Sequence, residues 1–570
     1  MRYWAIILAC FCSFLHGATP DAGIGGVGIA GAGFSASITG SYFLDPLPVS
    51  NRIDYATIAG ANERIANTVW TNLPASANYT EINFAISNCW RHASNGIVLL
   101  TNSTFVLTDR IKMRPGVHLS TIHGTNTLLI LTNQIWLGNN LDNGTVATAA
   151  IVTGAWKGSS NVTAASAVNC TPGQYIVVTA TNDWSFVHPY GYEGGSATIW
   201  YGDGGSTVSD VNRGQVSRLV SVSNGTNLVI NPALQSDFTN TPGSLQWRQD
   251  TFSDVLPMVG YASIRNMAIQ CPTNAEGIEV HGAYDSFISN VVFRVPNQGS
   301  GSYSAINIAG AVNITVQHSH CEGATPQTSF VNVRENAGGI RVENNTGNWV
   351  YQFVVTASRG GNNYFGYNYN HQVTNGTSAM IDEFLSHGSH KQFQLWEGNR
   401  GYGLRFDNIH GSSSSQIAFR NYMVGEVTGY STFGWGSFWN DSWNYHNHWV
   451  GNVGGYAGMT AYVYEQESPT AVDKAIFSWG YHGYSTSPTT GTLSKATAVI
   501  HGNVTFESGV AVTNWATGYS RTLTNSLVYA SRPSWYGTNL AWPAYGPDVA
   551  GGHTNMIPAQ WRYLYGTNSF

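Results

Sequence analysis

Ile264-Arg265-Asn266, Ile288-Ser289-Asn290 and Val342-Glu343-Asn344 decide the fold, because in each an asparagine follows a short apolar run. The series extends over residues 263–421 and comprises Asn266, Asn290, His318, Asn344, Asn368, Asn399 and Asn421. Successive members are 24, 28, 26, 24, 31 and 22 residues apart. A repeat of this length, with short β-rich runs and no long helical pattern inside it, is typical of a solenoid of stacked coils. The sequence therefore predicts a parallel β-helix.

The repeated asparagine has a local physical reason. Each coil turns sharply between short strands, and asparagine tolerates left-handed backbone while its amide caps the turn. Stacked coils place successive amides about 4.8 Å apart, where they can bond as a ladder. We therefore expect these asparagines to be structural and not catalytic.

Composition limits the class of protein. Charged residues make up 10% of the chain, against about 25% in ordinary domains, while glycine contributes 64 residues. The net charge of −6 and the absence of a Lys/Arg run argue against a nucleic-acid partner. Cys89, Cys170, Cys271 and Cys321 follow the N-terminal segment without a Cys-x-x-Cys pair, so we expect buried thiols or at most one disulfide, no metal site and no cofactor.

Residues 1–18 resemble a secretory signal. Arg2 supplies the basic start, Trp4 to Leu15 the apolar segment, and Gly17-Ala18 the small-residue exit. The apolar segment is too short to span a bilayer, and no later segment is long enough. These features predict a secreted protein, extracellular or periplasmic, with no membrane insertion.

The rest of the chain divides into five segments. Residues 19–65 form a Gly-rich arm, and residues 66–154 contain a capping helix and the first coils. Thr80 is the expected N-cap of a helix over residues 81–93 that covers the apolar end of the solenoid. Residues 155–256 alternate like antiparallel strands and are interpreted as a β-rich excursion, not an independent domain. Residues 257–530 are the main β-helix, and residues 531–570 form a turn-rich tail packed on it.

Three groups of motifs resemble a known superfamily. They are Asn95-Gly-Ile-Val-Leu-Leu with Thr104-Phe-Val-Leu and Gly116-Val-His-Leu-Ser, Leu395-Trp-Glu-Gly-Asn399 with Asp407-Asn-Ile-His-Gly411 and Ala418-Phe-Arg-Asn421, and Arg532-Pro-Ser-Trp-Tyr-Gly with Trp542-Pro and Ile557-Pro-Ala. Together they resemble secreted bacterial members of the pectate-lyase-like (pectin lyase fold) superfamily over about residues 50–565. The resemblance implies a right-handed parallel β-helix and a carbohydrate-active function, although fold does not determine function.

The sequence departs from the best-known activities of that superfamily. It lacks the aspartate cluster that holds calcium in pectate lyases and the Asn-x-Asp pattern with paired aspartates of polygalacturonases. Neither activity is therefore carried over to this chain.

Charged residues are scarce, so a cluster of them within two predicted coils is a candidate catalytic site. Its members are Glu383, His387, His390, Glu397, Asp407, His410 and Arg420. The pairs Glu383/Asp407, His387/His410 and Glu397/Arg420 are separated by 24, 23 and 23 residues, which would stack partners about 5 Å apart. Two carboxylates at that distance suit a retaining glycosidase, whereas His beside Arg suits proton abstraction next to a uronate carboxylate. Structural roles remain open: Glu397 and Asp407 as turn residues, and Arg420 as a partner of Glu397.

Candidate substrate-binding residues lie in the same region. They are Arg400, Arg405, Trp435, Trp439 and Trp443. The aromatic run suits stacking on sugar rings, but its spacing of four also fits a helix packed against the coils. We therefore expect a monomeric protein that cleaves an extracellular polysaccharide, as a glycoside hydrolase or a polysaccharide lyase. The alternative is a non-catalytic glycan-binding or surface β-helix protein.

Overall fold

The structure, a computed structural model, describes most of the chain after residue 67. The described residues are 68–93, 95–121, 126–138, 145–181, 211–234, 238, 244–249, 258–296, 303–323, 329–357, 360–373, 383–388, 391–408, 411–426, 436–459, 462–467, 474–481 and 491–566. The predicted signal sequence and Gly-rich arm lie outside them.

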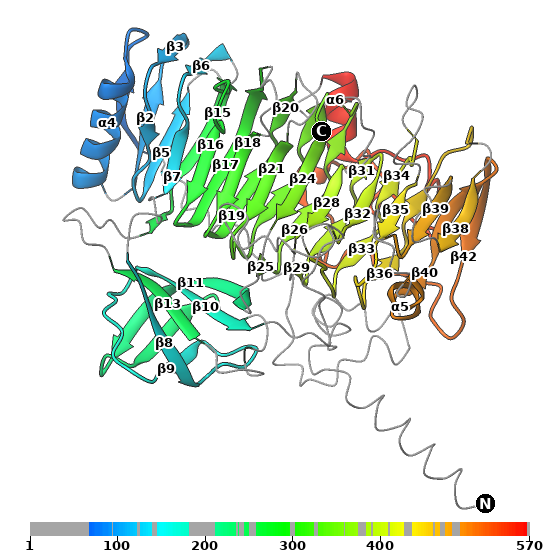
Figure 1. Ribbon diagram of the computed structural model, residues 1–570. Coiled ribbons are helices and arrows are strands. Elements are labelled where there is room, and N and C mark those ends of the chain that lie inside the picture. Colours follow the sequence, from blue (N-terminus) through cyan, green and yellow to red (C-terminus); the bar gives the residue numbers. More distant parts are fainter. Residues whose placement is uncertain are drawn as a thin grey trace, which may run out of the picture.

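The chain winds into a stack of coils whose strands form two long parallel sheets (Figure 1). The larger, sheet A, has 23 strands and bends at a corner, so later coils contribute one strand before it and one after it. Section A1, before the corner, contains β19 (Val312–Gln317), β22 (Arg341–Glu343), β26 (Tyr364–Gly366), β30 (Leu395–Glu397), β33 (Ile417–Phe419), β36 (His448–Val450) and β40 (Val499–His501). Section A2, after it, contains β20 (His320–Glu322), β23 (Thr346–Asn348), β27 (Tyr369–Asn370), β31 (Arg400–Gly401), β34 (Tyr422–Met423), β37 (Val453–Gly454) and β41 (Asn503–Glu507).

The remaining strands of the stack belong to earlier coils, to its last edge, to sheet B and to one small sheet. Sheet A also includes β1 (Val69–Leu73), β2 (Gly96–Leu100), β3 (Thr104–Leu107), β5 (Val117–Thr121), β6 (Leu128–Leu131), β14 (Val259–Gly260), β15 (Ser263–Gln270), β17 (Ala283–Arg294) and β42 (Val510–Asn514). Sheet B contains β4 (Ile111–Lys112), β7 (Ile135–Gly138), β16 (Ile278–His281), β18 (Ser304–Ala309), β21 (Ser329–Arg334), β24 (Gln352–Ala357), β28 (Phe384–His387), β32 (Leu404–Phe406), β35 (Phe438–Asn440), β39 (Ala475–Trp479) and β38 (Val463–Glu467). A two-stranded sheet pairs β25 (Gly360–Gly361) with β29 (Lys391–Gln392).

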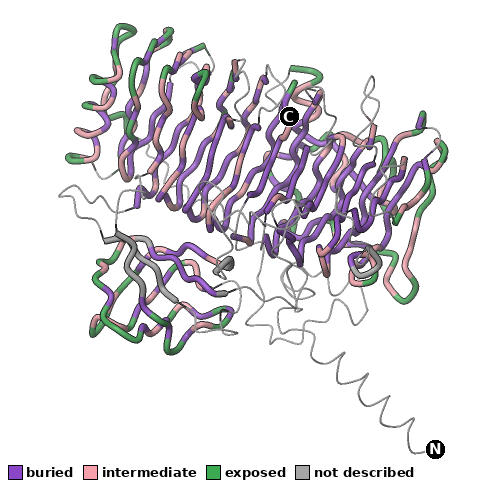
Figure 2. The backbone as a smooth tube through the Cα atoms, in the orientation of Figure 1, coloured by how far each residue is buried: buried purple, intermediate pink, exposed green. Residues whose placement is uncertain are grey.

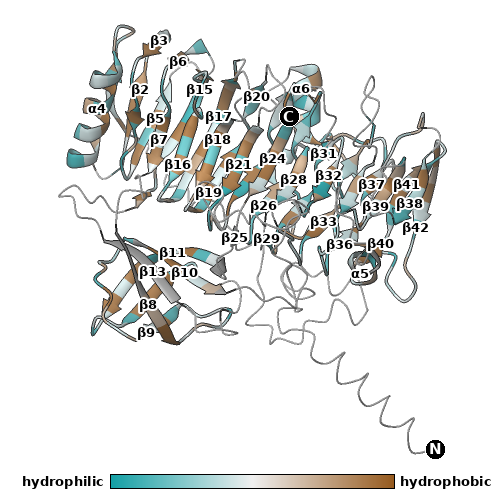
Figure 3. Ribbon diagram, viewed as in Figure 1, coloured by the Kyte–Doolittle hydropathy of each residue, from teal (hydrophilic) through white to brown (hydrophobic). Residues whose placement is uncertain are grey.

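The parallel register aligns core residues of one coil with core residues of the next. Val342, Phe365 and Trp396 are partners on adjacent strands, and all three are fully buried. Figure 2 shows the strands of the stack mostly buried, and Figure 3 shows hydrophobic segments recurring on them. The predicted right-handed parallel β-helix is confirmed.

The corner of sheet A corrects the predicted asparagine ladder, because it holds two columns and not one. In one column the backbone is left-handed, with φ of 59° at Asn266, 53° at Asn290 and 50° at Asn344. In later coils Tyr367 and Arg420 occupy this position, with φ of 55° and 52°. Asn368, Asn399 and Asn421 of the predicted series lie one residue after this position. The predicted series therefore combined members of two different columns.

The second column is a buried ladder of side-chain amides. Its members are Asn345, Asn368, Asn399, Asn421, Asn452 and Asn503. Asn399 Oδ1 accepts the backbone N–H of Asn368 at 3.1 Å and the Nδ2–H of Asn368 at 3.0 Å. Asn399 Nδ2 also donates to Phe365 O at 2.8 Å. Each amide therefore satisfies backbone groups that the bend removes from the strand ladder.

An amphipathic helix covers the first end of the stack, as predicted, but its start is two residues earlier. Helix α4 spans Tyr79–His92, and its N-cap is Asn78, not Thr80. Asn78 Oδ1 accepts the N–H groups of Thr80 and Glu81, while the Glu81 carboxylate accepts the N–H of Asn78. This reciprocal capping box is the stronger start signal. Ile82 and Ile86 on the inner face are fully buried.

The inserted segment is a closed antiparallel barrel with its own hydrophobic core. It contains β8 (Thr145–Thr153), β9 (Asn161–Ala164), β10 (Tyr175–Thr181), β11 (Val211–Ser223), β12 (Asn227–Asn231) and β13 (Ser244–Gln249). It therefore begins before the predicted boundary at residue 155. Val216 donates its N–H to Asn336 O at 3.2 Å, and the Arg218 guanidinium lies 4.7 Å from the Tyr284 ring centroid, so the barrel contacts the stack.

Residues 515–566, here called the strap, return along the outward face of sheet A. The strap contains the short helix η7 (Ser534–Tyr536) and ends in α6 (Pro558–Tyr565). Leu527, Tyr536 and Tyr545 of the strap are fully buried in one cluster with outward residues of A1 and A2. A further helix, α5 (Gly491–Ala496), precedes β40.

Two further expectations can be compared with the described residues. Cys89, Cys271 and Cys321 are buried free thiols, and Cys170 is a half-buried one. Within this part of the chain, no helix is both long enough and apolar enough to cross a bilayer.

Candidate functional site

The predicted site residues do not form one cluster, because the structure distributes them over three faces of the stack. His387, Asp407, Arg405 and Trp439 lie on the outward face of sheet B, Glu397 and Arg420 lie beneath the strap, and Glu383 and Arg400 lie near A2. His390, His410 and Trp435 are outside the described residues.

On sheet B, His387 and Asp407 form a close pair. His387 is at the end of β28 and Asp407 directly follows β32, the next strand in the sheet. His387 Nδ1 lies 2.5 Å from Asp407 Oδ2. The His387 side chain keeps 13% exposure, whereas the Asp407 side chain has none.

Arg405 and Asp441 form a second pair beside the first. Arg405 donates to Asp441 Oδ2 from Nε at 3.1 Å and from Nη2 at 2.7 Å. The Arg405 guanidinium also lies 5.1 Å from the Trp439 ring centroid and 5.6 Å from that of Tyr481. Arg405 is 4% exposed and Trp439 is 5% exposed. Both side chains are therefore buried and paired here, and their predicted roles in binding substrate stay predictions.

The register of sheet B differs from the predicted pairing of Glu383 with Asp407. Phe384 pairs with Leu404 and Ser386 with Phe406, so His387, and not Glu383, aligns with Asp407. Phe406 pairs in turn with Asn440, which aligns Asp407 with Asp441. His387, Asp407 and Asp441, here called the sheet-B column, thus stand on adjacent strands about 4.8 Å apart. The prediction failed because the His387–Asp407 step is only 20 residues.

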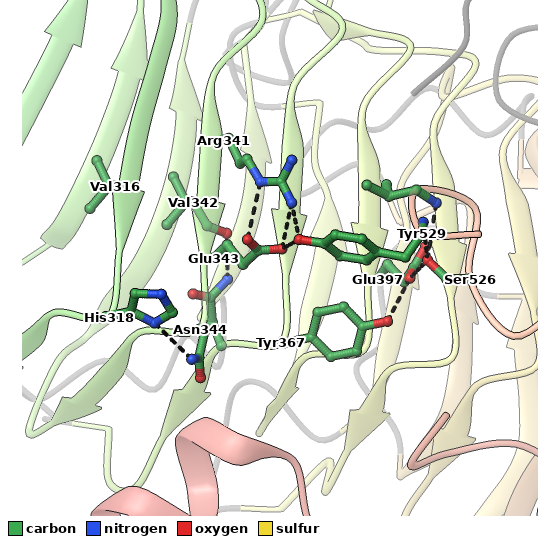
Figure 4. Close-up of polar contacts among 12 residues, drawn as sticks. Val316, His318, Arg341, Val342, Glu343, Asn344, Tyr367, Glu397, Ser526 and Tyr529 are labelled. Carbon is green, nitrogen blue, oxygen red and sulfur yellow. Dashed lines mark hydrogen bonds and ion pairs between the residues drawn. The ribbon is translucent and has the colours of Figure 1, made fainter. Parts of the chain in front are cut away.

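Glu397 is fully buried, and it accepts hydrogen bonds from the strap and from the corner of sheet A. Its carboxylate accepts the Ser526 hydroxyl, the Leu527 N–H at 2.9 Å and the Tyr367 hydroxyl at 2.8 Å (Figure 4). Burial raises the pKa of Glu397, and these hydrogen bonds oppose the rise. The geometry gives Glu397 a structural role.

Arg420 is a second anchor of the strap. Among the described residues it forms no hydrogen bond or ion pair with Glu397, although its positive charge opposes the rise in the pKa of Glu397. It bonds Asp548 through Nη1 and Nη2, both at 2.9 Å, and donates to Thr524 O and Tyr545 O at 2.9 and 2.7 Å. Register also separates the predicted pair, because Glu397 aligns with Phe419.

Glu383 lies behind A2, away from Asp407. It is fully buried, accepts the N–H of Tyr402, and has a pKa that burial raises to about 8. A Cβ at Gly401 would collide with its carboxylate, which explains that glycine. Arg400, on β31, lies with its guanidinium 3.5 Å from the Tyr422 ring centroid.

The aromatic run after residue 435 is not a helix. Trp439 lies in β35, and Trp443 lies in a turn with φ of 64°. Trp449 lies in β36 and is fully buried in the core. The spacing of four reflects strand, turn and strand, so the alternative of a packed helix is wrong.

A further polar cluster, which the sequence analysis missed, combines Arg341, Glu343 and Tyr529 (Figure 4). Arg341 binds both carboxylate oxygens of Glu343, at 2.9 and 3.1 Å, and the Tyr529 hydroxyl contacts both side chains. Burial raises the pKa of Glu343 to about 7, and the Arg341 charge opposes the rise. Arg341-Val-Glu343 shows the alternation that places two charges on one strand face, but Tyr529 is 186 residues away in the chain.

The described residues contain no group of three or more His, Cys, Asp or Glu side chains placed to hold a metal ion. The polar side chains described above can take part in acid–base chemistry and hydrogen bonding. The sheet-B column suits it best, because it contains a partly exposed imidazole bonded to a buried carboxylate.

The stacked coils form a parallel β-helix. No protein-family model matches the chain, and no curated protein matches it in sequence. In structure it is similar to the tailspike gp61 of Pseudomonas phage phi297, with 13% identity, 75% of this chain and 76% of the tailspike covered, and a TM-score of 0.38. PfbA, a surface adhesin of Streptococcus pneumoniae, has 12% identity, coverage of 78% and 99%, and a TM-score of 0.35. The A-module of the Azotobacter vinelandii mannuronan C-5 epimerase AlgE6 has 10% identity, coverage of 76% and 96%, and a TM-score of 0.34. Similarity at this level does not indicate a shared activity.

Proposed function

We propose that this protein is exported and acts on an extracellular polysaccharide, with His387 and Asp407 performing a proton transfer in its cleavage. The observation that supports this most directly is the 2.5 Å contact between His387 Nδ1 and Asp407 Oδ2. An Asp407 carboxylate that accepts the Nδ1 proton places the imidazole lone pair on Nε2 and stabilises the imidazolium formed when Nε2 takes a proton. His387 is the more exposed partner, so a substrate meets the imidazole.

Elimination fits this column better than retaining hydrolysis. A retaining glycosidase needs one protonated carboxyl and one nucleophilic carboxylate. Asp407 and Asp441 are instead bonded to His387 and Arg405. In elimination from a uronate chain, His387 takes the proton next to the carboxylate, a carbon–carbon double bond forms, and the leaving oxygen departs with the electron pair of the broken C–O bond and is then protonated.

The second candidate function is glycan binding without cleavage. Arg405, Asp441 and Trp439 argue against catalysis at this face, because all three are buried and already paired with one another or with neighbouring side chains. Such a face resembles a rigid structural surface more than an open reaction centre.

One assay separates the two candidates. The chain from residue 19 is incubated with neutral and uronate polysaccharides, and new reducing ends and the ultraviolet absorbance of unsaturated uronate are followed together. The proposal predicts both signals on a uronate polymer and their loss in His387→Ala and Asp407→Asn. Polymer retention without either product would establish the binding function instead.

A further inference from the structure

The outward face of A2 carries a row of polar and aromatic side chains that the proposed reaction does not use. The parallel register places them in two columns that cross four strands, here called the A2 row. Its members are His320, Glu322, Thr346, Asn348, Tyr369, His371, Arg400 and Tyr402. The alternate residues point inward, and Cys321 among them is fully buried in the core.

The strap covers this row only in part, unlike the A1 face. The Glu322 side chain is 45% exposed and that of His320 is 25% exposed. Trp349, which follows Asn348, is 44% exposed. From α6 of the strap, Tyr563 extends over the row with its ring centroid 4.7 Å from that of His371. The row is therefore a surface with an aromatic wall on one side.

Hydrogen bonds fix the side chains of the row before any ligand arrives. His320 contacts Glu322 at 3.3 Å, and Asn348 donates to the same carboxylate at 2.9 Å. The Tyr369 hydroxyl lies 2.9 Å from His371 Nδ1. Groups held in this way lose little conformational entropy when they bind a ligand.

Two arginines give this region positive charge that no described carboxylate neutralises by an ion pair. Arg400 contacts the Tyr422 ring, and its buried Nη1 has no hydrogen-bond partner among the described residues. Arg562 of α6 bonds the side-chain and backbone oxygens of Asn344, at 3.3 and 2.6 Å, and no carboxylate in the described part of the chain. Arginine without a carboxylate partner beside aromatic rings favours an anionic ligand.

We propose that the A2 row binds an acidic, carboxylate-bearing sugar chain lying along the axis of the stack. Arg400 binds a sugar carboxylate, the rings of His371 and Tyr563 pack against sugar faces, and Glu322 accepts hydroxyl hydrogen bonds about 14 Å away, three strands along. The choice of a sugar as the anion rests on the proposed function, whereas the anion preference rests on the row alone.

The test measures the dissociation constant for polygalacturonate, with dextran as the neutral polymer, at low salt. All proteins carry His387→Ala, so that binding is measured without cleavage. Arg400→Gln is expected to weaken polygalacturonate binding about tenfold or more, because it removes a hydrogen bond between two charged groups. The matched control Arg521→Gln, an exposed strap arginine with the same change in charge, is expected to change it less than about twofold.

A second measurement follows polygalacturonate binding at increasing salt concentration in the chain that keeps Arg400. It does not require the Arg400→Gln variant to fold. Polygalacturonate binding is expected to weaken as salt rises. Equal effects of Arg400→Gln and Arg521→Gln, salt-independent binding, or equal affinity for dextran would each overturn the proposal. Failure of the reaction proposal gives a different result: the unsubstituted chain forms no product from polygalacturonate, while binding still depends on Arg400 and on salt.

Discussion

The A1 face and the sheet-B column both bury carboxylates, but they hold them by different means. On A1, Glu397 and Glu343 are bonded by Ser526 and Tyr529, which the strap brings from more than a hundred residues away. In the sheet-B column, Asp407 is bonded by His387 of the neighbouring strand. Partners from the strap attach a distant segment to the stack, whereas the partner in the column belongs to the site that we propose for proton transfer.

The largest effect on stability is expected at the strap. Arg420→Met removes a buried cation, leaves the Asp548 carboxylate without its ion-pair partner and leaves backbone oxygens without their donor. Breaking such a pair costs about 3–5 kcal/mol. Urea unfolding measures the loss, and limited proteolysis should show earlier cleavage within the strap. A change no larger than that in the exposed control Arg521→Met would contradict the anchoring role.

A smaller effect separates the two asparagine columns of the corner. Asn399→Ala leaves the buried N–H of Asn368 and the carbonyl of Phe365 without partners, which costs about 1–3 kcal/mol. Asn290→Gly keeps the left-handed backbone of an exposed corner, and we expect a change of about 0.5 kcal/mol or less. If urea unfolding showed the same loss of unfolding free energy in both variants, the buried ladder would contribute no more to stability than the exposed column.

A third prediction is a pH dependence of stability at Glu343. Its pKa is about 7 in the folded chain, against the ordinary 4.5, so the folded chain retains a proton that the unfolded chain has lost. This contribution to stability is complete below pH 4.5 and is lost as pH rises through about 7. Glu343→Gln should therefore lose less stability than the unsubstituted chain between pH 4.5 and 8. An identical pH profile of the urea midpoint would refute the assignment.

The sequence allowed the fold to be predicted, but it did not allow the partners of the candidate site residues to be predicted. The parallel β-helix follows from local turn chemistry at a regular spacing, which every coil repeats. Partner assignment needs the length of each coil, and that length varies: His387 and Asp407 are 20 residues apart, whereas Glu397 and its strand partner Phe419 are 22 apart. A contact between residues far apart in the chain produces no repeating pattern in the sequence. The hydrogen bond between Glu397 and Ser526 was therefore not predictable.

The measurement that tests the account most directly compares His387→Gln with Glu397→Gln in the same two assays, polymer cleavage and urea unfolding. We predict that His387→Gln unfolds like the unsubstituted chain but cleaves at least about a hundredfold more slowly. Glu397→Gln should be less stable, while its folded fraction cleaves at an unchanged rate. The opposite pattern, with normal cleavage in His387→Gln and a stable but inactive Glu397→Gln, would place the chemistry beneath the strap and contradict the account.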